Sequence, residues 1–123
     1  MAWKFVQKTG ELFNSEGKKI AVGWAGQGEG KNNPDMQSVH GIGPLPVGVY
    51  TITAPYENTH TGPYTMNLIP NENNNMFGRE DFRIHGAAFE NPELSSEGCI
   101  IMPRPTREAI WGSGDHTVEV ISQ

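Results

Sequence analysis

The amino-acid sequence predicts a mainly β fold, a compact sandwich or barrel with a single short helix near the end of the chain. Two observations support this prediction: short apolar runs show the period of two that is typical of strands, and turn residues separate them. The 15 glycines and 9 prolines make up about a fifth of the 123 residues, against roughly 12% in average proteins. The length suits one domain over residues 1–123, without a linker or an internal repeat.

The first part of the chain predicts an opening hairpin, a further strand and a long loop. Side chains alternate over residues 3–7, and Thr9-Gly10 should turn the chain toward a short strand at residues 11–13. Residues 19–24 are rich in apolar side chains and predict another strand. Residues 25–38 are polar and rich in glycine, so we expect an irregular loop there.

The second part predicts five more strands, at residues 49–53, 64–69, 82–85, 99–102 and 117–121. A turn at residues 43–48 precedes the first of them, and Pro70 ends the second. Only residues 106–111 have a helical pattern, with Thr106 as a candidate N-cap and Gly112 just past the last turn.

Charge and composition exclude several classes of protein. Lys and Arg number 9 against 14 Asp and Glu, a net charge of −5 with no basic run, so we expect no nucleic-acid partner. No stretch approaches the roughly 18 apolar residues of a membrane-spanning helix. The N-terminus lacks the apolar core and cleavage site of a signal peptide, which predicts synthesis in the cytoplasm and export by another route.

The chain contains one cysteine and four histidines, and neither set suggests a metal site. A single cysteine excludes an intrachain disulfide and a multi-cysteine metal centre. His40, His60 and His116 lack metal-ligand spacing with one another or with Cys99, and surface positions explain them. The three glycines within residues 26–30 lack the following helix of a nucleotide-binding loop, so we expect no metal and no cofactor.

The sharpest functional signal is Cys99, which follows His85 by 14 residues. Both lie at the ends of predicted strands, so the fold could bring thiol and imidazole together. A thiol with a pKa near 8.5 is mostly protonated at neutral pH, and a nearby histidine can accept its proton to make a nucleophile. Gly98 has no Cβ, which lets a carbonyl carbon and backbone N–H groups approach closely, and Ser96 could hold the loop.

A structural role for the cysteine is the alternative. A lone cysteine is most often a small buried apolar residue, and Ile100 and Ile101 would fit a core strand. The joint occurrence of His85-Gly86 and Ser96-Glu97-Gly98-Cys99 favours catalysis over this alternative.

This pair of motifs resembles the L,D-transpeptidase catalytic domain, whose signature is His-Gly, a loop and then Ser/Thr-x-Gly-Cys. The chain from about residue 3 to residue 121 is most similar to the small L,D-transpeptidase-like domains of type VI secretion effectors, the Tlde1-like branch. The shared features are the N-terminal aromatic strand, the glycine-rich loop 28–34, the segment GPLPVGVY at 43–50, Gly78-Arg79 and Arg107.

Two positions depart from the transpeptidases that synthesise cell wall. Those enzymes often carry His where this chain has Glu97, and Arg or Asn where it has Ile101. The usual contact with a substrate carboxylate is therefore missing at Ile101. Because isoleucine at this position agrees with the effector branch, an antibacterial effector or lytic factor is favoured over wall synthesis.

The resemblance implies a cysteine-dependent enzyme that acts on the stem peptides of peptidoglycan. Cys99 would attack the carbonyl of the third stem residue, release the terminal D-amino acid and form a thioester, while His85 moves the proton. The N–H groups of Cys99 and Gly98 are oxyanion-hole candidates, with Ser96 and Gly86 supporting the loop. The sequence leaves hydrolysis, cross-linking and exchange open.

Stem peptides carry carboxylates, so a positive charge near the cleft is expected. Arg83 lies two residues before His85 and should point to the same face of its strand, and Arg79 and Arg104 are the other candidates. For each arginine, a solvated surface charge is the alternative.

Two rival functions remain open at this point: a non-catalytic β-rich wall-binding or phage-particle module with a structural cysteine, and a general cysteine peptidase. An effector would act in the periplasm or cell wall of a bacterium. It would need a secretion or phage delivery apparatus, and the producing cell would need an immunity protein.

Overall fold

Ten strands form one sheet in the computed structural model, which describes residues 2–123. The strand order is β3-β2-β1-β10-β5-β7-β8-β9-β4, with β6 paired to β7 beside this path. The strands are β1 (Trp3–Val6), β2 (Glu11–Phe13), β3 (Lys19–Val22), β4 (Trp24–Ala25), β5 (Gly48–Ile52), β6 (Tyr56–Asn58), β7 (Gly62–Pro70), β8 (Phe82–His85), β9 (Ile100–Ile101) and β10 (Thr117–Ile121). The prediction of a mainly β fold is confirmed.

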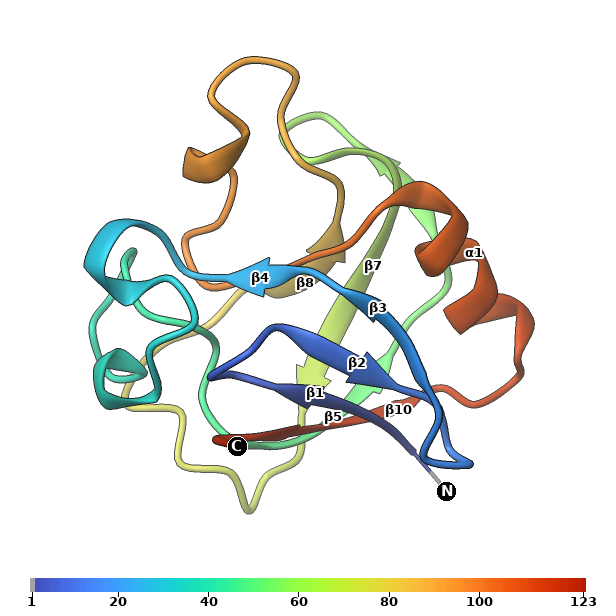
Figure 1. Cartoon of the computed structure of the whole chain (residues 1–123), viewed down its shortest axis with the longest axis horizontal. Helices are drawn as coiled ribbons and strands as arrows, with labels where there is room; N and C mark the ends of the chain where they lie inside the picture. The colour runs from blue at the N-terminus through green and yellow to red at the C-terminus, as the bar shows by residue number, and fades with distance from the viewer. Residues whose placement is uncertain (1) are drawn as a thin grey trace.

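The sheet curls almost into a barrel, because its two edge strands, β3 and β4, are consecutive in the chain (Figure 1). Helix α1 (Arg104–Gly112) packs beside the barrel, and the loop of residues 86–98, orange in Figure 1, projects from it. Three short 3-10 turns lie in the loops, at Gly28–Gly30, Pro34–Met36 and Pro92–Leu94. Within residues 2–123, no helix has the length and apolar character needed to span a bilayer.

Side chains alternate along the strands, and those on one face of the sheet pack into a single apolar core. Phe5 of β1, Tyr50 of β5 and Val118 of β10 are each fully buried on adjacent strands. The hydroxyl of Tyr50 donates to the carbonyl of Pro46 at 2.7 Å, so the one polar atom of this side chain is paired. Burial is the main reason that the pKa of Tyr50 is raised.

The strand predicted over residues 19–24 is divided at Gly23, and this division closes the barrel. On one side of Gly23, Val22 pairs with Glu11 in β2; on the other, Trp24 pairs with Ile101 in β9. The Gly23 N–H donates to the Gly10 carbonyl at 2.8 Å. A Cβ at position 23 would overlap the carbonyl oxygen of Ile101, so only glycine lets the chain cross from one sheet edge to the other.

Several other boundaries differ from the sequence-based prediction. Strand β6 was not predicted, and β7 extends beyond residues 64–69 at both ends, because the two strands pair as a hairpin. Thr106 is not the N-cap: α1 begins at Arg104 after Pro103, and Gly112 lies inside it. Pro105 explains the earlier start, since a proline in the first helical turn lacks only an N–H that the helix leaves unpaired.

We predict that Gly23→Ala destabilises the fold, because the added methyl group must displace the β9 backbone or open the barrel. The expected loss in free energy of unfolding is about 3 kcal/mol, at the upper end of the overpacking range. Urea denaturation of the two proteins measures it.

The matched control is Gly112→Ala, where a Cβ would meet open space at the end of α1. That variant should be neutral or slightly stabilised, and an equal loss in both variants would contradict the closure argument. A single cooperative transition in the parent protein would support the prediction of one domain over residues 1–123.

Candidate active site

The parallel pairing of β8 with β9 brings the two motif residues to one face of the sheet. Ile84 pairs with Ile100, and both side chains are buried in the core. Because side chains alternate along a strand, His85 on β8 and Cys99 at the start of β9 lie on the opposite face. The 86–98 loop separates His85 from Cys99 along the chain, and backbone pairing brings the two residues to the same face of the sheet.

A cavity of about 620 Å³ opens on this face, and both Cys99 and His85 line it. Arg83 lines it too, as the expectation of a shared face with His85 requires. Acidic side chains face the same space, those of Glu80, Asp81 and Glu97. The candidate nucleophile and base therefore share a cavity with both signs of charge.

His85 is held by the backbone of its own neighbour. Its Nδ1 lies 2.8 Å from the carbonyl oxygen of Gly86. Because a carbonyl oxygen only accepts, Nδ1 carries the proton and Nε2 is the basic nitrogen of the neutral ring. Burial lowers the pKa of His85, the bond to Gly86 raises it, and the charges of Arg107 and Arg83 lower it further, so the ring is neutral at pH 7.

Cys99 is a buried free thiol at the edge of the cavity. Its Sγ donates weakly to the Asp81 carbonyl at 3.9 Å, and among residues 2–123 no hydrogen bond joins Sγ to the imidazole. Burial raises the pKa of Cys99, although the N–H and guanidinium of Arg83 lower it in part. The protein therefore holds a neutral thiol and a neutral imidazole at pH 7 rather than an ion pair.

Ser96 fixes the loop that carries the cysteine. Its fully buried hydroxyl accepts from the N–H of Gly26 at 2.8 Å and of Gly98 at 3.1 Å. The same hydroxyl donates to the Cys99 carbonyl at 2.6 Å. The Gly98 N–H is thus engaged in this state, and the Cys99 N–H remains the oxyanion-hole candidate.

Gly98 adopts a backbone conformation that side chains disfavour, with φ of +134°. A Cβ there would lie 2.6 Å from both Arg79 Nη2 and Phe82. Its carbonyl accepts from the Leu45 N–H at 3.0 Å. Glycine is therefore required before the cysteine for packing as well as for access to the sulfur.

A comparison with protein families covers most of the chain. A family model for the Tlde1 domain matches residues 19–120. The chain belongs to the Tlde1 domain family. This family comprises type VI secretion effectors with L,D-transpeptidase-like activity, so the resemblance stated from the sequence is confirmed. Searches of curated proteins and of solved structures found no match.

In this Tlde1 domain, Arg79 is buried and hydrogen-bonded to the backbone. Its side chain is 6% exposed, and its two Nη atoms donate to four backbone carbonyls, those of Gln37, Gly43, Pro44 and Glu97. These bonds connect the 37–44 loop to the loop before the cysteine. The placement favours a structural role for Arg79 over direct contact with substrate.

The other two candidate arginines lie in different places. Arg83 lines the same cavity as Cys99 and His85. Its Nη1 donates to the Asp81 carbonyl at 3.2 Å, and the neighbouring Tyr56 hydroxyl raises the pKa of Arg83. Arg104 lies on α1, outside this cavity, and pairs with Glu108 at 3.1 Å. The arginines are therefore not one substrate-binding group.

The structure adds residues that the sequence reasoning missed. His40 and His60 are exposed, as expected from the sequence, and both also line the cavity that holds Cys99; His40 Nε2 lies 3.1 Å from the Phe77 carbonyl. Arg107 is buried and donates to the Met102 carbonyl at 3.0 Å, beneath Gly86. No local pattern marks these roles, because each depends on contacts between distant segments. Among residues 2–123, no group of three or more potential ligands could hold a metal ion.

We predict that the two candidate catalytic groups limit stability at opposite ends of the pH range. The lowered pKa of His85 gives stability that is lost as pH falls below the ordinary value of 6.5. The raised pKa of Cys99 gives stability that is lost as pH rises above the ordinary value of 9.0. The free energy of unfolding, measured from about pH 4 to about pH 11, should decline at both the acid and the alkaline end.

His85→Gln should flatten the acid decline alone, and Cys99→Ala the alkaline decline alone. Alkylation of the native protein by iodoacetamide should accelerate only above the ordinary thiol pKa. A midpoint of alkylation below neutral pH would show instead that the free protein holds a thiolate.

We also predict that Ser96→Ala loosens the loop that carries the cysteine. The substitution leaves two buried N–H groups and one carbonyl without their partner, at about 1–3 kcal/mol for each unsatisfied group. The expected loss in free energy of unfolding is about 3 kcal/mol overall, measured by urea denaturation. Ser95→Ala, which removes one bond to the Ala88 N–H, is the control and should lose about 0.5 kcal/mol.

Proposed function

We propose that this chain is a cysteine-dependent enzyme that cleaves peptidoglycan stem peptides as an antibacterial effector. The observation that supports it best is that Cys99 and His85 line one cavity, with His85 Nε2 left basic by the bond from Nδ1 to Gly86. A nucleophile and a general base must share a cavity, and the Gly86 carbonyl supplies the third group that orients the base. Membership of the Tlde1 domain family supports peptidoglycan as the target.

The first step transfers the thiol proton of Cys99 to His85 Nε2 as Sγ attacks the carbonyl of the third stem residue. In the structure Sγ donates to the Asp81 carbonyl, so the thiol must turn toward the imidazole for this transfer. Catalytic hydrogen bonds commonly tighten only in the complex. A neutral thiol and a neutral imidazole suit this order of steps, since the imidazole is free to accept a proton.

The tetrahedral intermediate then collapses to a thioester. The amide C–N bond breaks, His85 returns the proton to the leaving nitrogen, and the terminal D-amino acid departs. The Cys99 N–H is the proposed donor to the oxyanion, and loss of one such donor typically lowers the rate by about 10²–10³. Arg83, beside the sulfur, is the proposed contact for a carboxylate further back on the stem.

Delivery and location follow from the same proposal. A type VI secretion apparatus would carry the chain to the periplasm, where stem peptides are accessible. The producing cell would hold an immunity protein against it. The cavity is lined by acidic residues and by Arg83, and this polar surface is what an inhibitor could recognise.

One observation favours the alternative of a non-catalytic wall-binding module. Cys99 is 9% exposed and bonds to a backbone carbonyl, as a structural cysteine would. The two functions differ in whether stem peptides change chemically, so one experiment separates them.

The test is incubation of purified sacculi with the protein, followed by mass analysis of the muropeptides. We expect tetrapeptide stems to be shortened to tripeptides or exchanged at the fourth position. Cys99→Ala and His85→Ala should each reduce conversion by at least about 10³-fold, the scale seen when a catalytic nucleophile or base is removed. Far-ultraviolet circular dichroism checks that both variants fold.

His116→Ala is the matched histidine control, because His116 stacks on Trp111 and does not line the cavity. It should retain conversion. Unchanged stems with binding to sacculi would support the wall-binding module, and unchanged stems with cleavage of a protein substrate would support a general cysteine peptidase.

A further inference from the structure

A second cavity of about 520 Å³ adjoins the catalytic one. His60 and Thr61 line both cavities, so they form a shared wall. Gly86, next to the candidate base, lines the second cavity, while Cys99 lines the first. A group that departs from the attacked carbonyl carbon on the His85 side therefore has this second space beside it.

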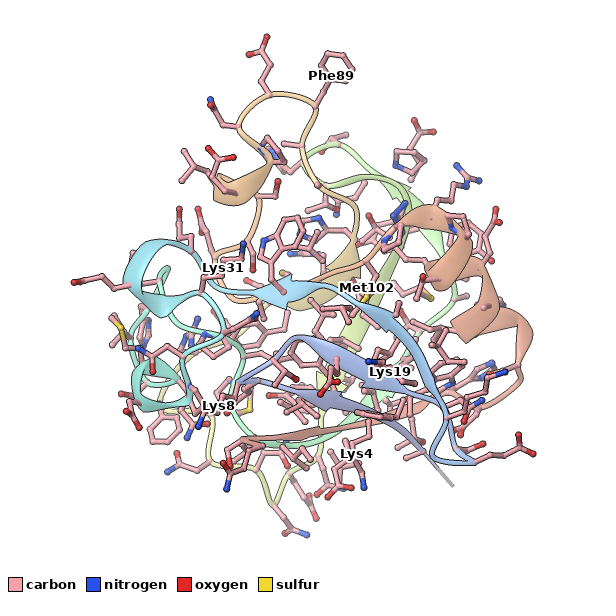
Figure 2. The ribbon with its side chains drawn as sticks, in the orientation of Figure 1. Lys4, Lys8, Lys19, Lys31, Phe89 and Met102 are labelled. Carbon is pink, nitrogen blue, oxygen red and sulfur yellow. The ribbon has the colours of Figure 1, made fainter. Side chains whose placement is uncertain are left out.

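The 86–98 loop borders both spaces. Its start, Gly86 to Phe89, lines the second cavity, and its end, including Leu94 and Glu97, lines the first. Figure 2 shows Phe89 at the outermost tip of this loop, where the ring points away from the barrel and is fully exposed. One loop thus connects the two cavities over the strand that carries His85.

The two cavities differ in the charge they offer a ligand. In the catalytic cavity, Arg79 is engaged with carbonyls, and Arg83 shares the lining with three acidic residues, Glu80, Asp81 and Glu97. The second cavity is lined by Arg104, whose side chain is 52% exposed, and by no Asp or Glu among the described residues. The second cavity therefore offers the free carboxylate of the terminal stem residue an arginine with no acidic residue in the described lining.

Arg104 is positioned to reach such a carboxylate. Its guanidinium lies 5.2 Å from the centroid of the Tyr64 ring, which supports it from one side. Its Nε pairs with Glu108 in an exposed i,i+4 bridge, the kind that contributes about 0.3–0.5 kcal/mol and is easily exchanged. Arg107, the other arginine of this cavity, is occupied by backbone carbonyls.

We propose that the second cavity binds the D-amino acid that leaves the stem peptide, and that Arg104 binds its free carboxylate. This inference rests on the proposed function and specifies where one of its products lies. It supplies the carboxylate contact that Ile101 cannot make, from a different element of the fold. A planar guanidinium can hold a carboxylate through two parallel hydrogen bonds.

The same subsite accounts for exchange. Attack of an amine on the thioester is the reverse of thioester formation, so an incoming D-amino acid occupies the position of the departing one. Its neutral nitrogen attacks the carbonyl carbon, the C–S bond breaks, and one amine proton passes through His85 Nε2 to the Cys99 sulfur. The products are a new amide and the free thiol, so free D-amino acids act as acceptors beside water.

The test measures binding rather than turnover, using Cys99→Ala as the background. Two synthetic tetrapeptide stems are compared by isothermal titration calorimetry, one with a free terminal carboxylate and one with a terminal amide. The carboxylate peptide should bind roughly tenfold more tightly, as expected for a partly exposed charged hydrogen bond. Adding Arg104→Gln should remove this preference and leave the amide peptide unaffected.

Two further variants make the test specific. Lys4→Gln removes the same charge on the exposed side of β1 and should keep the preference. Glu108→Gln frees Arg104 from its ion pair and should increase the preference. An equal affinity for both peptides in the Cys99→Ala background, no binding of either, or a preference that survives Arg104→Gln would each overturn the subsite.

Failure of this inference is distinguishable from failure of the proposed function. A carboxylate preference that depends on Arg104, with no conversion of sacculi by the parent protein, would overturn the catalytic proposal and leave the subsite in place. Conversion of sacculi without such a preference would overturn the subsite alone.

Discussion

Parallel pairing between β8 and β9 is the constraint on which the candidate active site depends. Ile84 and Ile100 pair in register and enter the core, and full burial of such side chains stabilises a fold by about 1.5–3 kcal/mol each. Alternation along the two strands then places His85 and Cys99 together on the other face. The core therefore holds the chemistry in position, although neither candidate catalytic group belongs to it.

Buried hydrogen bonds complete what the strand pairing begins. Ser96 connects Gly26, Gly98 and Cys99 through one hydroxyl, and Arg79 connects four carbonyls from two loops. Buried polar groups stabilise a unique arrangement when every partner is satisfied. The loop before the cysteine is thus preorganised by polar contacts where short strands provide little packing.

Burial in the cavity keeps the candidate nucleophile protonated at neutral pH. Burial disfavours both the thiolate of Cys99 and the imidazolium of His85, so their pKa values move in opposite directions, up and down respectively. A protonated thiol is a poor nucleophile, so reactivity depends on the substrate drawing Sγ toward Nε2. The nearby charges of Arg83 and Glu97 act on the thiol in opposite senses.

Local pattern was sufficient for most of the strands and for the choice of Cys99 and His85 as candidates. Alternating side chains predicted β1 and β10, and the His-Gly and Ser-x-Gly-Cys motifs pointed to the two residues, because these signals depend on neighbours in the chain. Tertiary structure alone decided the break at Gly23, the carbonyl contacts of Arg79 and Arg107, and the entry of His40 and His60 into the cavity. Each of these depends on contacts between segments that are far apart along the chain, and such contacts leave no periodic trace in the sequence.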